Sequence, residues 1–151
     1  MKLEKFVKSV GTHGVIFENK GKKWLFDGIT MMLIPDTICI GRAAAMPIYM
    51  NPETFDSSNA DLTKAYLPSA DAKAKDIVRV FETADSDEMA ISQRDFALIE
   101  SGDETRILYD SYDIDESNIV GLGVYTGYGE DAQLIGIIFD NEYLHMERDE
   151  D

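Results

Sequence analysis

The side chains of this chain that are best suited to chemistry are carboxylates, and they gather in residues 110–116. Four fall there, at Asp110, Asp113, Asp115 and Glu116. Oxygen-rich loops of this kind bind hard cations such as Ca²⁺. An EF-hand loop that began at Asp113 would require Gly at its sixth position and Glu at its twelfth, where this chain has Asn118 and Val124. We therefore interpret the segment as a solvated acidic loop.

The sequence contains no established catalytic or cofactor motif. Gly121 and Gly123 begin a glycine-rich stretch, but no Gly-Lys-Ser/Thr follows and the stretch leads into a predicted strand, so it does not indicate a phosphate-binding loop. His13 and His145 lack the paired spacing of a zinc site, and the single cysteine, Cys39, has apolar neighbours typical of a buried thiol. We expect no metal, no nucleotide cofactor and no enzymatic activity.

Charge is distributed unevenly along the chain. Residues 1–75 contain ten basic and eight acidic residues, a net charge of +2, whereas residues 76–151 contain four arginines, no lysine and 21 acidic residues, a net charge of −17. Such a field repels the phosphates of nucleic acids and attracts basic surfaces. We therefore expect a protein partner and no direct contact with nucleic acid.

These features favour a non-catalytic interaction or assembly protein, which binds a basic protein or copies of itself. A phage structural or accessory subunit would have this character. The expected partner-binding carboxylates lie in the acidic loop, at the tip of a predicted hairpin and at the acidic end 147–151; they are Asp110, Asp113, Asp115, Glu116, Glu130 and Asp131. Methionines suit adaptable protein interfaces, so Met46 and Met50 form an apolar candidate surface.

Two other functions stay open at this point. The first is an inhibitor that mimics DNA, which would present its acidic face to the basic groove of a nucleic-acid-binding protein. The second is a small enzyme without a recognisable motif, whose site would be a pocket with perturbed titratable groups.

Length and composition predict one folded domain over residues 1–151. The chain is 44% hydrophobic and 10% aromatic, as in ordinary globular proteins. No apolar run approaches the roughly 18 residues that a membrane span requires, and the N-terminus is too interrupted by charge for a signal peptide. We expect a cytoplasmic protein, of a bacterial or a virus-infected cell, or a component of a virion, with no membrane contact.

The pattern in residues 1–42 predicts an N-terminal β-meander. Short strands are expected at 3–10, 15–18, 23–27, 29–34 and 37–40, separated by turns rich in Gly and Asn. Residues 43–47 suit either a helix start or extended chain. Residues 51–59 resemble a surface loop, and residues 60–66 resemble one or two helical turns.

Residues 69–84 begin with helix-forming residues but include the β-branched run 77–81, so both types stay open. A short helix is expected from Ser92, its N-cap, to Gly102. A β-hairpin region is expected over 104–146, with strands at 106–109, 118–126 and 133–140. The sequence thus predicts an α+β fold that is mainly antiparallel β, as a meander or a small barrel or sandwich, with one or two short helices.

Overall fold

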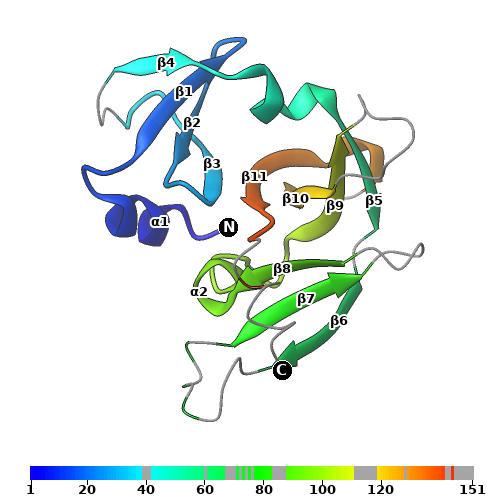
Figure 1. Cartoon of the computed structure of the whole chain (residues 1–151). Helices are drawn as coiled ribbons and strands as arrows, with labels where there is room; N and C mark the ends of the chain where they lie inside the picture. The colour runs from blue at the N-terminus through cyan, green and yellow to red at the C-terminus, as the bar shows by residue number, and fades with distance from the viewer. Residues whose placement is uncertain are drawn as a thin grey trace.

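The computed structural model describes residues 1–38, 42–59, 61–66, 71, 73, 75, 77–82, 88–110, 119–127, 129–141 and 144; for residues 59 and 61–66 it describes the backbone alone. Two β-sheets and two short α-helices account for most of these residues (Figure 1). The larger sheet has eight strands in the order β4-β1-β2-β3-β11-β10-β9-β5, and the smaller has three in the order β6-β7-β8. All pairs are antiparallel except β1 with β4, which confirms the mainly antiparallel α+β fold.

Helix α1 (Leu3–Val10) replaces the strand expected at this position. The expectation was wrong because the apolar residues recur at helical spacing: Phe6 and Val10 are buried on one face, with Leu3 and Val7 packed beside them. Glu4 in the first turn and Lys8 in the last complement the helix dipole. Gly11, with φ of 57°, ends the helix.

The meander that follows agrees with the sequence. Strands β1 (Val15–Asn19), β2 (Lys22–Phe26) and β3 (Thr30–Ile34) pair antiparallel in chain order. Lys20 and Gly21 both have positive φ, as a tight two-residue hairpin turn requires. Beyond β3, Thr37 and Ile38 belong to a turn closed by a hydrogen bond from the Ile38 N–H to the Pro35 carbonyl, not to the expected strand, and Cys39 and Ile40 lie outside the described residues.

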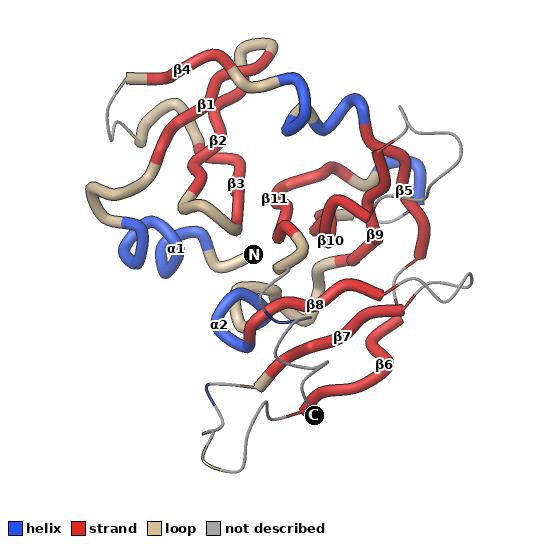
Figure 2. The backbone as a smooth tube through the Cα atoms, in the orientation of Figure 1, coloured by secondary structure: helices blue, strands red, loops and turns tan. Residues whose placement is uncertain are grey.

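The chain next crosses between the two edges of the larger sheet. The segment left open at 43–47 includes β4 (Ala43–Ala45), which pairs parallel with β1. The expected surface loop at 51–59 instead contains β5 (Phe55–Asn59), which pairs with β9. Two 3₁₀ turns, η1 (Ile48–Met50) and η2 (Pro52–Thr54), join these edge strands across the top of the view in Figure 2.

The smaller sheet consists of β6 (Asp61–Tyr66), β7 (Val78–Glu82) and β8 (Glu88–Ser92). The helical turns expected over 60–66 were wrong: Ala, Leu and Lys favour helix, but pairing with β7, interrupted only by a register shift between Leu62 and Lys64, outweighs that local preference. The ambiguous run at 77–81 is a strand, whose Val78, Val80 and Phe81 are buried. Ser69 lies outside the described residues.

Helix α2 (Gln93–Phe96) begins where the sequence places it and ends earlier. Ser92 is its N-cap and accepts a hydrogen bond from the Asp95 N–H. The expected end at Gly102 was wrong: α2 ends at Phe96 with Ala97 as its C-cap, and Gly102 lies in a later turn.

The C-terminal strands confirm the expected hairpin. β10 (Ile119–Thr126) pairs with β9 (Glu104–Asp110) on one side and with β11 (Gln133–Phe139) on the other. The 3₁₀ turn η4 (Gly129–Asp131) lies in the connection from β10 to β11, and the β10–β11 register shifts between Val124 and Tyr125. None of the described helices is both long and apolar enough to cross a membrane.

The larger sheet is strongly curved, and both of its faces are covered (Figure 1). On one face, α1 packs over β1–β3 and the smaller sheet packs over β9–β11. The opposite, concave face forms a second core together with η1; its buried members are Trp24, Met31, Met50, Leu108 and Ile137.

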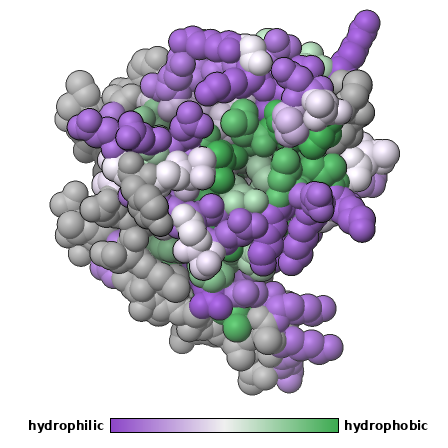
Figure 3. Space-filling model, turned by 180° about the vertical axis from the view of Figure 1, so that it is seen from behind, coloured by the Kyte–Doolittle hydropathy of each residue, from purple (hydrophilic) through white to green (hydrophobic). Residues whose placement is uncertain are grey.

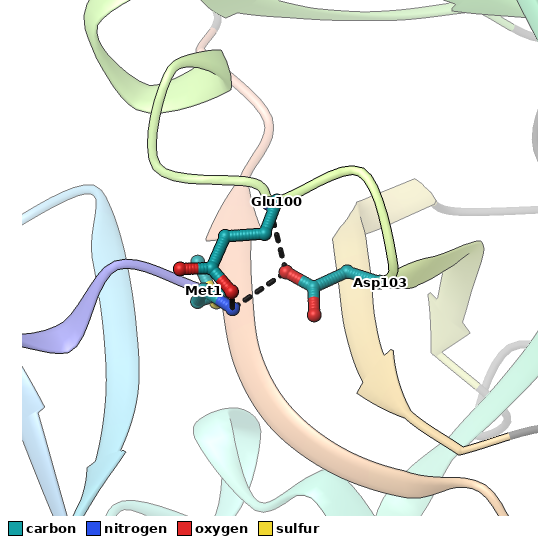
Figure 4. A network of polar contacts seen from close by, with 3 residues as sticks. All are labelled: Met1, Glu100 and Asp103. Carbon is teal, nitrogen blue, oxygen red and sulfur yellow. Dashed lines mark hydrogen bonds and ion pairs between the residues drawn. The ribbon is translucent and has the colours of Figure 1, made fainter.

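The N-terminal amine, next to α1, interacts with residues 100–103, which follow α2 in the chain (Figure 4). The Met1 ammonium lies 2.5 Å from Oδ2 of Asp103, whose side chain is 8% exposed. The same carboxylate oxygen accepts the Glu100 N–H at 2.9 Å. The more distant Glu100 carboxylate, at 3.9 Å, is 54% exposed and contributes little.

Candidate functional site

A pocket opens on the concave face of the larger sheet, where several strand ends meet η1. Its walls are Phe26 at the end of β2, Phe139 at the end of β11, Val120 near the start of β10, and Tyr49 and Met50 of η1. Its volume is about 300 Å³. Apolar and aromatic walls of this kind bind apolar groups rather than charged ones.

Two large apolar side chains protrude beside this pocket. Ile48 is 74% exposed and Tyr49 is 75% exposed, the highest values among the large hydrophobic residues of the described chain. The geometry of η1 is the cause: hydrogen bonds from Met50 N to Pro47 O and from Asn51 N to Ile48 O close a single tight turn. Met50 then points into the core, 5% exposed, and its two predecessors point outward.

Contacts of Asn51 and Glu53, the residues that follow η1, fix this turn against the end of β1. The Asn51 side-chain oxygen accepts the Glu53 N–H at 3.1 Å and the Asn19 side-chain amide at 3.2 Å, which ties η2 to the end of β1. Lys20 and Glu53 form an exposed ion pair at 2.7 Å. The exposed apolar pair therefore projects from an anchored turn.

Seen from behind, hydrophobic side chains gather in one region of the molecular surface, with hydrophilic side chains around it (Figure 3). Independently of that view, the exposed pair and the pocket adjoin, because Tyr49 is also a wall of the pocket. Isolated apolar side chains are common on protein surfaces, but apolar side chains that adjoin a pocket are typical of an interaction site. We call Ile48, Tyr49 and the pocket walls Phe26, Val120 and Phe139 the η1 surface.

Acidic residues lie at the strand ends around the η1 surface. Asp27 follows Phe26 and accepts the N–H groups of Ile29 and Thr30. Asp140 follows Phe139 and accepts the Ala90 N–H, which ties β11 to the smaller sheet. Asp110 pairs across from Phe55 at the start of β5, next to the exposed Asp56.

The structure does not bring the predicted acidic site residues together. Asp110 is at the end of β9, directly after Tyr109, which pairs with Ile119 at the start of β10. Glu130 and Asp131 are exposed in η4, beyond the opposite end of β10. The other expected carboxylates, Asp113, Asp115 and Glu116, and the acidic end 147–151 lie outside the described residues.

The apolar candidates Met46 and Met50 belong to the concave-face core. They support the η1 surface from within, while the residues that expose apolar area are the intervening Ile48 and Tyr49, which sequence reasoning missed. Pro47 and Pro52 indicate a turn in the sequence, but they do not distinguish the exposed Ile48 and Tyr49 from the buried Met50.

The buried polar residues of the described chain satisfy one another. Asp95, 5% exposed, accepts hydrogen bonds from Thr30 Oγ1 at 2.9 Å and from Ser92 Oγ at 2.7 Å. This trio joins α2 to β3 and is a structural network. Within the same residues, no group of three or more His, Cys, Asp or Glu side chains is arranged to hold a metal ion.

A second polar cluster secures the tip of the β10–β11 hairpin. Arg106 Nη2 donates to Glu104 Oε2 at 3.0 Å and to the Gly129 carbonyl at 3.1 Å, and its guanidinium lies 4.4 Å from the centre of the Tyr125 ring. Burial raises the pKa of the Tyr125 hydroxyl, although a hydrogen bond with Ser57 and the Arg106 charge act in the opposite direction.

A larger groove of about 760 Å³ lies beside α1. Its apolar lining comes from Leu3 and Val7 of the helix and from Pro35 and Ile38 after β3. The helix also contributes charged lining residues, Glu4, Lys5 and Lys8, all exposed. We call this the α1 groove.

The structure thus has two candidate binding features, the exposed η1 surface and the separate α1 groove. Any function assigned to them is argued from the residues that form them. Comparison of the chain with protein-family models, with curated protein sequences and with solved structures finds no match.

Proposed function

We propose that this chain is a non-catalytic interaction or assembly protein, and that it binds a basic protein partner or a further copy of itself through the η1 surface. The observation that carries the proposal is the exposure of Ile48 and Tyr49, at 74% and 75%, on an anchored turn beside an apolar pocket. A large aromatic side chain next to a pocket is the usual energetic centre of a protein interface.

The charge of the chain supports a basic partner. The net charge is −15, and Asp27, Asp56 and Asp110 lie at the strand ends around the η1 surface. Carboxylates around an apolar centre would speed the approach of a positively charged surface and select against an acidic one. The apolar centre would supply most of the affinity.

Affinity purification from the native source tests the proposal with two matched variants. The first, Ile48→Ser with Tyr49→Ser, removes the exposed apolar pair. The second, Glu130→Ser, changes an exposed residue of η4, which lies beyond the opposite end of β10 from Val120. We expect the wild type and Glu130→Ser to retain the same specific protein, a basic one or further copies of the chain, and the double variant to lose it.

Measuring partner binding at low and high salt separates the electrostatic from the apolar contribution to that binding. Raising the ionic strength shortens the reach of surface charges to a few ångströms, so it should slow association while leaving the apolar contact in place. If the double variant retained the same partner as strongly as the wild type, the η1 surface would not be the binding site and the proposal would be wrong.

A further inference from the structure

The α1 groove and the η1 surface differ in form and in the charge of the residues beside them. The groove has an apolar lining, Leu3, Val7, Pro35 and Ile38, and two exposed lysines at its edge, Lys5 and Lys8, against one acidic residue, Glu4. The η1 surface presents two protruding apolar side chains, and the chain directly after them carries the exposed residues Glu53 and Asp56. Glu53 forms an exposed ion pair with Lys20, so a lysine of a partner would share its carboxylate, whereas Asp56 adds a second acidic group. The first feature is a groove with two lysines at its edge, and the second is a projection with two acidic residues beside it.

The lysines are arranged to meet an acidic partner. Lys5 and Lys8 are three residues apart on α1, and the exposed N-cap residue Lys2 precedes Lys5 by three, so the three lysines follow one side of the helix. Residues 47–58, which contain the projection, include two acidic residues and no basic one.

The two features cannot meet within one molecule. Helix α1 lies at the left of Figure 1, at about mid-height, whereas η1 and η2 lie in the chain that crosses at the top. An interaction between them must therefore join two molecules, and it would use different surfaces on each. Such a head-to-tail contact leaves one projection and one groove unused at the ends of the assembly, so it can add further copies until a ring closes.

We infer that the partner at the η1 surface is a second copy of this chain, whose α1 groove receives Ile48 and Tyr49. This inference rests on the proposed function and specifies its partner. A groove of about 760 Å³ is within the range of pockets that enclose molecules larger than two side chains. Lys5 and Lys8 of the receiving copy would face Glu53 and Asp56 of the inserted one.

Sedimentation velocity with two complementary variants tests this arrangement. The projection variant is Ile48→Ser with Tyr49→Ser, and the groove variant is Lys5→Glu with Lys8→Glu. All four positions are exposed, so both variants should fold, as circular dichroism can check. We expect the wild type to form oligomers larger than dimers as its concentration rises, and each variant to associate at least about tenfold more weakly.

The mixture of the two variants gives the decisive result. The projection variant keeps an intact groove and the groove variant keeps an intact projection, so one productive contact remains possible per pair. We expect the mixture to form a dimer of one copy of each variant and nothing larger. A symmetric contact between identical surfaces would not be restored by mixing.

A charge exchange provides the control. Adding Glu53→Lys and Asp56→Lys to the groove variant should restore oligomers in a single chain, because the signs at the contact are reversed together. The pair Lys73→Glu and Lys75→Glu, between β6 and β7 and away from both the groove and η1, should assemble like the wild type.

The failure of this inference is distinguishable from failure of the proposed function. A wild type that stays monomeric at every accessible concentration, or a mixture that stays monomeric, overturns the self-assembly inference. If the purified chain is monomeric but Ile48 and Tyr49 are still needed to retain a different, basic protein, the inference is wrong and the proposed function holds.

Discussion

The ring of Phe26 meets the ring of Phe139 edge-on, with centroids 5.8 Å apart and planes at 79°. The two residues belong to β2 and β11, which are not neighbours in the sheet, because β3 lies between them. The contact spans β3 across the concave face, above Met31, which pairs with both Phe26 and Ile137. This aromatic pair forms two walls of the pocket at the η1 surface.

Phe139→Ala should therefore destabilise the fold, by about 2 kcal/mol for a half-buried ring. Tyr49→Ala is the matched comparison: it removes another aromatic side chain from the same pocket, but one that is 75% exposed, so it should change stability by less than about 0.5 kcal/mol. Urea unfolding of both variants measures this. Equal losses would mean that Tyr49 packs into the fold and is not available to a partner.

Asp95→Ala should cost about 1–3 kcal/mol, because it leaves the hydroxyl groups of Thr30 and Ser92 without their acceptor in a buried site. Asp36→Ala, at an exposed turn, should be within about 0.5 kcal/mol of the wild type. Thermal or urea unfolding compares the two. A neutral Asp95→Ala would contradict the role of this carboxylate as the link between α2 and β3.

Gly121→Ala should be among the more destabilising small changes in the chain, at about 1–3 kcal/mol. A Cβ at this position would lie 2.8 Å from Cα of Phe139 and closer still to the carbonyl oxygen of Ile138, so the β10–β11 pair would have to separate. Gly102→Ala meets nothing within 4 Å and should be neutral. Chemical unfolding curves that failed to separate the two variants would contradict the close packing of these strands.

The Tyr125 hydroxyl should make the fold sensitive to alkaline pH. Its pKa is raised above the ordinary value of 10.0 by burial, so the folded protein keeps this proton at a pH where the unfolded chain releases it. The associated stability is complete below pH 10 and is lost as the pH rises through the folded pKa. Tyr125→Phe has no such proton, so its free energy of unfolding should fall less than that of the wild type between about pH 9 and about pH 11. Parallel curves for the two proteins would refute this.

The sequence predicted the elements whose signals are local. The hairpin turn at Lys20 and Gly21 and the N-cap at Ser92 follow from residue type and spacing, and the structure confirms them. The strand expected at Leu3–Val10 was wrong because the helical spacing of its apolar residues was overlooked, although it was visible in the sequence.

The remaining differences depend on contacts that a local reading does not include. β6 is a strand because β7 pairs with it, and β5 because β9 does, although neither segment has a strong strand pattern. The exposed pair Ile48 and Tyr49 could not be told from the buried Met50, since the orientation of η1 is set by Asn51 and its hydrogen bond with the distant Asn19.

Amide hydrogen exchange tests the central claim, that the η1 surface is where this protein binds, most directly. The measurement compares the monomer at low concentration with the bound state, formed with its partner or by self-assembly. We expect the amides of Met50 and Asn51, which are bonded only within the short turn, to exchange at least about tenfold more slowly in the bound state. Gly129–Asp131, at the acidic hairpin tip, should be unchanged. Slower exchange at the hairpin tip, without any change around η1, would contradict the claim. It would indicate that the partner binds the acidic residues Glu130 and Asp131 instead.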